Sequence, residues 1–271
     1  MSNPISAHMQ IMIKAAEKAA RSLVRDFGEV ENLQVSTKGP GDFVSAADKR
    51  SEEIIFEELS RARPDYGFLM EESGEKGPKD AKSRFIIDPL DGTSNFLHGI
   101  PHWCISIGLE ENGEVIAGLV YDPVKNDMFT AEKGQGAYIS RRKRLRVSGR
   151  TDPLASIIAL GEPRRSVKGS AEVFLKEHLA IQNTGASQRR FGAAALDLAY
   201  VAAGKCEAYW ERALQPWDIA AGYLIVKEAG GFVGDMDDDR HNPVKTGNVL
   251  AGNEALYATL KKVLRDVKKA A

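Results

Sequence analysis

One short segment, residues 84–95, restricts this chain more than any other stretch. It begins as an apolar strand and continues into Asp88 and Asp91, two acids three residues apart, with a proline between them and Gly92 directly after them. The proline should stop the strand ladder and place the acids on either side of a sharp turn, where their side chains can converge. Carboxylate oxygens are the ligands that Mg²⁺ prefers, usually together with phosphate and water. Backbone N–H groups of Gly92 and Thr93 would face an anion, as they do at helix N-termini.

Two further acids can reach the same point. Glu71 follows an apolar strand, and neighbouring strands lie ~4.8 Å apart. Asp218 is distant in sequence, but Pro216 places it in the first turn of a helix. Two carboxylates ~4 Å apart repel by ~4 kcal/mol at an effective dielectric constant near ~20, so the cluster needs shared protons or metal ions. An isolated Asp-Pro-x-Asp-Gly is usually a capped turn, and it is the additional acids that favour a two-metal site suited to phosphoryl transfer.

The composition sets broad limits on structure and location. With 271 residues, 43% of them hydrophobic, the chain can form one large domain or two subdomains. The 37 basic and 38 acidic residues nearly cancel, so no overall field favours nucleic acid or an anionic membrane. Cys104 and Cys206 stand in apolar surroundings and should be core thiols in a reducing compartment. Because we find neither a signal-peptide pattern nor an apolar run of ~20 residues, we expect a cytoplasmic protein.

Two halves of different pattern follow one another along the chain. Residues 1–150 should form an N-terminal α+β subdomain that carries the metal motifs, and residues 151–271 an α/β subdomain that closes the site with Asp218. The first half is expected to contain helices at 5–27 and 45–63 separated by a loop at 38–41, strands at 67–70 and 85–87, a mobile polar loop at 73–83, and an antiparallel meander at 103–147 with a hairpin turn at 111–113. The second half should alternate strands at 157–160, 207–210 and 249–251 with helices at 171–180, 193–203, 217–229 and 254–268. Mixed sheets layered with helices are the predicted fold class.

Several long motifs resemble the signature motifs of the inositol monophosphatases. They are Glu71-Glu72-Ser73, the run from Asp88 to Thr93 with Asn95, and the run from Trp217 to Gly222 with Glu228-Ala229-Gly230-Gly231. The resemblance extends from the first helix to about Leu264. Within this family, the chain is most similar to the bacterial members. It implies a layered αβαβα sandwich of the inositol monophosphatase and sugar phosphatase type. It also implies a hydrolase that depends on Mg²⁺, is often lithium-sensitive and is usually a homodimer.

The resemblance also implies roles for individual residues. The first of two or three Mg²⁺ ions would be held by Glu71, Asp88 and the carbonyl of Leu90, the second by Asp88, Asp91 and Asp218, and a third, weaker ion would face Glu71. Thr93 and Asp48 would orient the attacking water, so Thr93, Asp48 and Glu71 are the implied catalytic residues. Substrate would be bound by Gly92, Thr93, Asp91, Asp218, Ala194 and Glu211. From the residues alone, Asp48 indicates only an acid near a helix N-terminus and Glu211 an acid at a strand end.

The function that follows is hydrolysis of inositol monophosphate to inositol and phosphate by a metal-activated water. The same metal core could act on another phosphomonoester, among them fructose 1,6-bisphosphate, histidinol phosphate, a nucleotide 3′-phosphate or NADP. A second phosphate would need further basic residues, for which the candidates are Arg164, Arg165, Arg189 and Arg190. A third possibility is a non-catalytic role as a partner of the transcription machinery, with the basic run at 141–146 as its surface.

Four other features are assigned ordinary structural roles. The basic run at 141–146 should be a solvated hairpin edge and not a nucleic-acid site. The acidic run at 235–239 lacks the glycine and the final glutamate of a calcium loop and should be a plain loop. His98 and His102 should be rim or structural residues, and Trp210 and Trp217 should belong to the core near the site.

Overall fold

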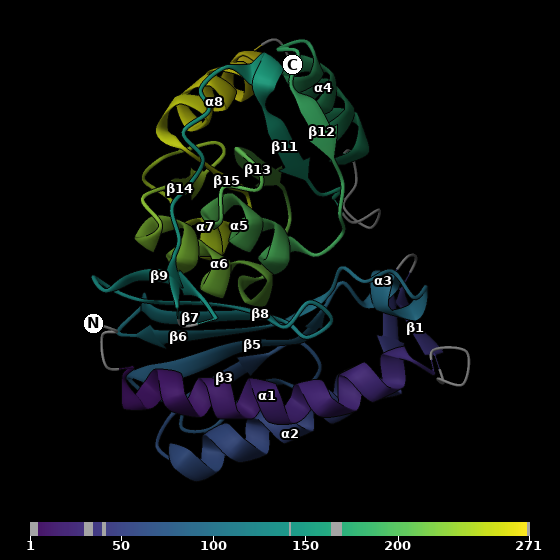
Figure 1. Ribbon diagram of the computed structural model, residues 1–271, viewed down its shortest axis with the longest axis vertical. Coiled ribbons are helices and arrows are strands. Elements are labelled where there is room, and N and C mark those ends of the chain that lie inside the picture. The colour runs from purple at the N-terminus through teal and green to yellow at the C-terminus, as the bar shows by residue number, and fades with distance from the viewer. Residues whose placement is uncertain (1–4, 30–34, 40–41, 141, 164–169, 270–271) are drawn as a thin grey trace.

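The structure, a computed structural model, describes residues 5–29, 35–39, 42–140, 142–163 and 170–269. Arg141, Arg164, Arg165 and part of the predicted loop at 38–41 lie outside these residues. Five layers of helix and sheet alternate along the long axis of the molecule (Figure 1). This arrangement confirms the predicted αβαβα sandwich.

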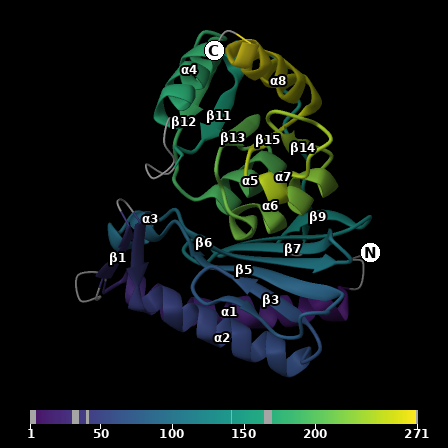
Figure 2. The same ribbon diagram turned by 180° about the vertical axis from the view of Figure 1, so that it is seen from behind.

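The five layers consist of three helix pairs and two sheets. α1 (Ala7–Phe27) and α2 (Ala46–Ala62) cover the outer face of the first sheet, which both views show at one end of the molecule (Figures 1 and 2). α5 (Ala194–Ala202) and α6 (Pro216–Glu228) lie between the two sheets. α4 (Ser170–Gln182) and α8 (Glu254–Lys269) cover the far side of the second sheet.

The first sheet has eight strands in the order β10-β9-β8-β7-β6-β5-β3-β4. They are β3 (Gly67–Met70), β4 (Gly74–Lys76), β5 (Ser83–Asp91), β6 (Cys104–Glu111), β7 (Glu114–Asp122), β8 (Asp127–Glu132), β9 (Gly136–Ile139) and β10 (Lys143–Arg144). β3 pairs with β5 in parallel, and β5 through β10 follow as antiparallel neighbours. The predicted meander is therefore confirmed. So is its first hairpin, where Asn112 and Gly113 both have positive φ, as a tight turn of this kind requires.

The second sheet has five strands in the order β12-β11-β13-β15-β14. They are β11 (Ile157–Leu160), β12 (Ser187–Arg189), β13 (Ala208–Glu211), β14 (Phe232–Asp235) and β15 (Val249–Gly252). Outside the two sheets are the antiparallel pair β1 (Val35–Gly39) and β2 (Asp42–Ser45), the short helices α3 (Thr93–Leu97) and α7 (Pro243–Thr246), and a 3₁₀ turn at Pro153–Ala155. The short elements β1, β2, β12, β14, α3 and α7 were not predicted from sequence.

Two local predictions were wrong. The segment 73–83 is not loop throughout, because β4 forms within it and pairs with β3. The proline after Asp88 does not end the strand, since β5 continues to Asp91 with a register shift in which Asp88 pairs with Ser106 and Asp91 with Cys104. Three residue steps on β5 therefore face two on β6, which is a β-bulge, and a bulge is a position where a strand tolerates proline.

The core between the sheets includes many alanine side chains. Ala195, Ala199, Ala220 and Ala221 on α5 and α6 are buried in one cluster with residues of both sheets. The two sheets have their strands on either side of residue 150, yet α5 and α6 pack against both. The division into subdomains at that residue stays a prediction. Cys104 and Cys206 are buried free thiols, as expected, and among the described residues no helix is both long and apolar enough to cross a membrane.

Gly118 allows α6 to approach the first sheet closely. A Cβ at this position would lie 2.6 Å from the carbonyl oxygen of Ala221, so Gly118→Ala forces a backbone to move. We expect it to lower the free energy of unfolding by about 1–3 kcal/mol, the usual cost of overpacking. Urea denaturation measures this change. Gly149→Ala is the control, because no atom lies within 4 Å of that Cβ, and it should change stability by less than about 1 kcal/mol. Equal effects of the two substitutions would contradict the packing argument.

Candidate functional site

Acids from both halves of the chain line one pocket of about 220 Å³. Glu71 follows the end of β3, Asp88 and Asp91 lie at the end of β5, and Asp218 is the third residue of α6. Leu90, Gly92, Thr93, Ala194 and Glu211 line the same pocket. Of the site residues expected from the sequence, Asp48 alone is not among those that line it.

The bulge in β5 aims its acids into the pocket. An Asp88 carboxylate oxygen accepts a hydrogen bond from the Leu90 backbone N–H at 2.9 Å, which closes the irregular segment on itself. The Leu90 carbonyl lies 3.0 Å from the Thr93 hydroxyl, which is also 3.3 Å from an Asp48 oxygen. The hydroxyl has a single proton to donate to these two acceptors. The two contacts together join α2, the bulge and α3 at one point.

The other two acids are also held in place by backbone donors. Asp91 accepts from the Ala195 backbone N–H at 2.7 Å, which ties the first sheet to the start of α5. Asp218 accepts from the Gln215 backbone N–H at 2.7 Å in a capping box, with Pro216 as the first helical residue. Both contacts fix a carboxylate at the beginning of a helix, as the sequence indicated for Asp218.

Gly92 occupies a position that only glycine fits. Its φ of 90° is in the left-handed region. A Cβ there would lie 3.0 Å from the His102 carbonyl oxygen and 3.1 Å from the Ala193 Cβ. The chain can therefore turn sharply from the bulge into α3, and this turn brings Gly92 and Thr93 to the pocket wall beside the acids.

The acids at the centre of the pocket destabilise one another. Asp88 is 2% exposed, and its pKa is raised well above the ordinary value by burial and then by the charges of Glu71, Asp91, Asp218 and Asp48. Burial also raises the pKa of Asp91 to about 7, although the Ala195 N–H opposes the shift. Hard divalent cations suit this set of oxygen donors, because their charge relieves the repulsion between the acids.

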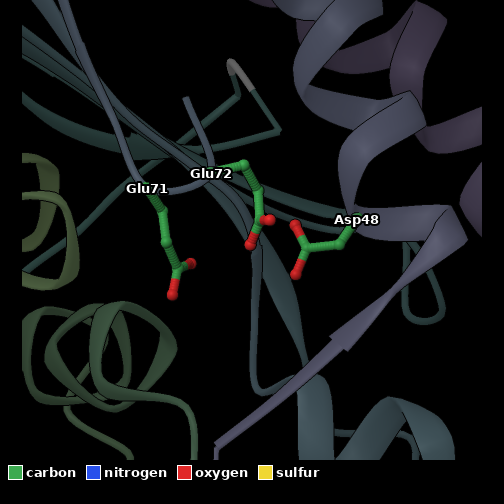
Figure 3. Close-up of side chains that lie close together, drawn as sticks. All are labelled: Asp48, Glu71 and Glu72. Atoms are coloured by element: carbon green, nitrogen blue, oxygen red, sulfur yellow. The ribbon is translucent and has the colours of Figure 1, made fainter. Parts of the chain in front are cut away.

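A second group of acids lies next to this centre. Figure 3 shows the carboxylates of Asp48, Glu71 and Glu72 turned toward one another from α2 and the end of β3. One ligand oxygen from each lies within 4.8 Å of the others, a spacing that suits a shared cation. No role was predicted for Glu72, although its place beside Glu71 in the Glu-Glu-Ser motif was a usable signal.

The outer wall of the pocket carries arginines that are already paired. Arg190 contacts Glu162 at 2.6 Å. Arg212 contacts the buried Glu177 at 2.6 Å and Asp237 at 2.8 Å. Arg190, a candidate for binding a second phosphate, lines the pocket, as do Glu162, Arg212 and Asp197, which were given no place in the site from sequence. Ion pairs between residues this far apart in sequence leave no local pattern from which they could be recognised.

The histidines, the tryptophans, the acidic run and the basic run that were assigned structural roles lie in positions consistent with those roles. His102 is buried, its Nε2 lies 2.9 Å from an Asp197 oxygen, and burial lowers its pKa to about 4, as suits a structural residue. His98 is exposed. Asp235 accepts the backbone N–H groups of Asp237 and Asp238 and so caps a turn. Trp210 and Trp217 pack in or against the core, and the described part of the basic run includes the edge strand β10.

A five-layered sandwich with acids from both halves around one pocket defines a protein of the sugar-phosphatase type. The Inositol monophosphatase family model matches residues 5–269, and the chain belongs to that family. An inositol-1-monophosphatase of Mesorhizobium japonicum is 51% identical over 260 residues, which are 96% of this chain and 97% of that protein. A Nus factor SuhB of Escherichia coli is 39% identical over 265 residues, 96% of this chain and 98% of that one. The crystal structure of the extragenic suppressor protein suhB from Bartonella henselae matches with a TM-score of 0.91 and 51% identity, covering 96% of this chain and 99% of that one.

The raised pKa of Asp91 should make the metal-free protein less stable as the pH rises. Between the ordinary value of 3.8 and the folded value of about 7, the folded state retains a proton that the unfolded chain has released. Stability then falls by up to about 1.4 kcal/mol per pH unit. Asp91→Asn removes this contribution, so its free energy of unfolding, relative to the unsubstituted protein, should rise from pH ~4 to pH ~7. Urea denaturation in chelator measures the difference.

The control for this measurement is Asp266→Asn, on the exposed side of α8. Its stability relative to the unsubstituted protein should not vary over the same pH range. Parallel stability curves for Asp91→Asn and the unsubstituted protein would show that Asp91 is ionised in the metal-free fold, contrary to the burial argument.

Proposed function

We propose that this protein is a Mg²⁺-dependent phosphomonoesterase that hydrolyses inositol monophosphate to inositol and phosphate. The observation that carries the proposal is the set of acids from both halves of the chain, which line one pocket beside Gly92 and Thr93. Family membership and the name of the M. japonicum relative support the choice of substrate. A homodimer and sensitivity to lithium stay predictions from the resemblance, and a cytoplasmic location stays a prediction from the sequence pattern.

The pocket offers two overlapping sets of metal ligands. Glu71, Asp88 and the Leu90 carbonyl would hold one ion, and Asp88, Asp91 and Asp218 a second. The neighbouring Glu72 and Asp48 extend the first set toward a third, weaker ion near Glu71. When bound, such ions polarise phosphoryl oxygens and lower the pKa of water.

The remaining residues of the pocket orient the reactants. Thr93 is within hydrogen-bonding distance of Asp48 and of the Leu90 carbonyl, and donating to either leaves its oxygen free to accept a hydrogen bond from the attacking water. The Gly92 and Thr93 amides would bind phosphate oxygens and meet charge that develops on them. Ala194 and Glu211 line the same pocket, where they would contact hydroxyls of the ring. Direct attack by water requires no protein nucleophile.

The charge pairing on the outer wall favours a substrate with one phosphate. Arg190 and Arg212 are each paired with acids, so a second phosphate that bound to either of them would have to displace a carboxylate. The candidates Arg164 and Arg165 lie outside the described residues. Arg189 donates to the Gln188 carbonyl and is not among the residues that line the pocket. This pairing supports inositol monophosphate over fructose 1,6-bisphosphate.

A phosphate-release panel tests the proposed substrate. With Mg²⁺, inositol monophosphate should be hydrolysed with a higher kcat/KM than fructose 1,6-bisphosphate, histidinol phosphate, a nucleotide 3′-phosphate and NADP. Lithium should inhibit the reaction, and chelator should abolish it. If the enzyme prefers another compound of the panel, the proposed metal-dependent mechanism still holds but the proposed substrate is wrong. No release from any of them would refute the phosphatase assignment.

Single substitutions at the metal ligands test the proposed centre. Asp91→Asn and Asp218→Asn should each lower kcat at least ~100-fold, in the range of losing one transition-state contact. Both retain the shape of the side chain, and the exposed Asp266→Asn provides the matched control with unchanged kcat. Phosphate release at saturating substrate measures the effect. Near-normal turnover in either ligand variant would contradict the metal assignment.

A second candidate function is a role with the transcription machinery. The relative named Nus factor SuhB is the observation that favours it. The two functions can be separated through Asp218→Asn, because a catalytically inactive variant that still complements a deletion strain would indicate a role independent of hydrolysis. The exposed basic side chains of 142–146 are then the surface to examine.

A further inference from the structure

α2 turns a polar face toward the interior. Asp48, Ser51 and Glu52 are only 1%, 0% and 5% exposed. Their spacing of i, i+3 and i+4 places them on one face of the helix. The inward stripe of a surface helix is normally apolar, because that is how the helix gains its packing energy. Three buried polar residues at these positions therefore call for a specific reason.

Each of the three contacts a different segment of the acidic site. Asp48 lies 3.3 Å from the Thr93 hydroxyl. The Ser51 hydroxyl donates to the Pro89 carbonyl at 2.9 Å. Glu52 accepts the backbone N–H of Glu72 at 2.8 Å. Figure 3 shows how closely α2 approaches the end of β3 at Asp48.

The last two contacts hold the backbones that carry the acids. Pro89 is in the bulge of β5, between Asp88 and Asp91. Glu72 follows Glu71 directly after β3. Neither Ser51 nor Glu52 lines the pocket. One turn of one rigid helix thus spans the two acid-bearing segments and fixes their separation.

We propose that Ser51 and Glu52 are positioning residues that set the affinity of the acidic pocket for divalent cations. The acids repel one another in the metal-free protein, so the segments that carry them tend to separate. A hydroxyl and a carboxylate buried in α2 hold both segments at the spacing that shared cations need. Hydrogen-bonding partners behind metal ligands commonly change metal affinity 10–100-fold when they are removed. This proposal rests on the divalent-metal site of the proposed function.

Calorimetric titration of the chelator-treated protein with Mg²⁺ tests the proposal. Ser51→Ala removes the hydroxyl that donates to the Pro89 carbonyl. Glu52→Met removes the acceptor of the Glu72 N–H and retains a side chain of similar length. Each should raise the Kd for Mg²⁺ by about tenfold or more. Glu52→Gln retains an acceptor for the Glu72 N–H and should restore most of the affinity.

The same helix supplies matched controls. Glu53→Met removes an identical charge from the neighbouring exposed residue, and Ser60→Ala removes a hydroxyl far from the site. Both should bind Mg²⁺ as the unsubstituted protein does. Urea denaturation in chelator, run on every variant, separates affinity from fold stability.

The outcomes distinguish positioning from a purely structural role. If Ser51→Ala and Glu52→Met lower the free energy of unfolding but leave the Kd unchanged, the proposal is wrong. If Glu53→Met weakens binding as much as Glu52→Met, charge and not position is responsible, and the proposal is again wrong. Should one variant fail to fold, the other decides. An unsubstituted protein that binds no divalent cation would overturn the metal-dependent function itself.

Discussion

The mutual repulsion of buried carboxylates is the constraint on which this structure depends. Asp88 lies almost out of contact with solvent, and the charges of four neighbouring acids reach it. Such a cluster is unfavourable wherever it forms without counter-charge. The surrounding backbone therefore has to hold each acid separately, and donors from Leu90, Ala195 and Gln215 do so. The acidic pocket lowers the stability of the metal-free fold, and such a cost is common at functional sites.

The site exists because α5 and α6, both in the second half of the chain, pack against both sheets. α6 packs on the first sheet through Gly118, and its first turn carries Asp218. α5 packs beside it, and its first turn supplies the Ala195 N–H that binds Asp91 of the first sheet. Since both helices also contact the second sheet, a change in how the layers stack would separate Asp218 from the acids of β5. The alanine-rich surfaces of these helices are thus as necessary to the site as its ligands.

The sequence was informative where chemistry is local and less so where it is not. The αβαβα layering was implied by the family resemblance and the capping position of Asp218 followed from a helix-start signal, and both agree with the structure. The Asp88 segment was misjudged, because a proline after an acid is typical of a strand end and nothing local indicates a bulge. The ion pairs of Arg190 and Arg212 could not be predicted from the sequence, because each partner is distant in sequence. The polar face of α2 was likewise missed, because buried Ser and Glu look like surface residues until their partners are known.

The basic residues of the pocket are paired with acids, whereas its central acids repel one another, and this difference limits which ligands the pocket can bind. Arg190 and Arg212 are paired with acids, while Asp88 at the centre experiences the negative charges of Glu71, Asp91, Asp218 and Asp48. The metal-free pocket is therefore acidic at its centre, and the positive charges of its two arginines are already compensated by acids. Cations are attracted to such a centre, and a phosphate is repelled until they neutralise it. Because Arg190 and Arg212 are already paired, the described part of the pocket offers a phosphate its charge compensation through cations at the centre, which suits a substrate with one phosphate on an uncharged, hydroxyl-rich body.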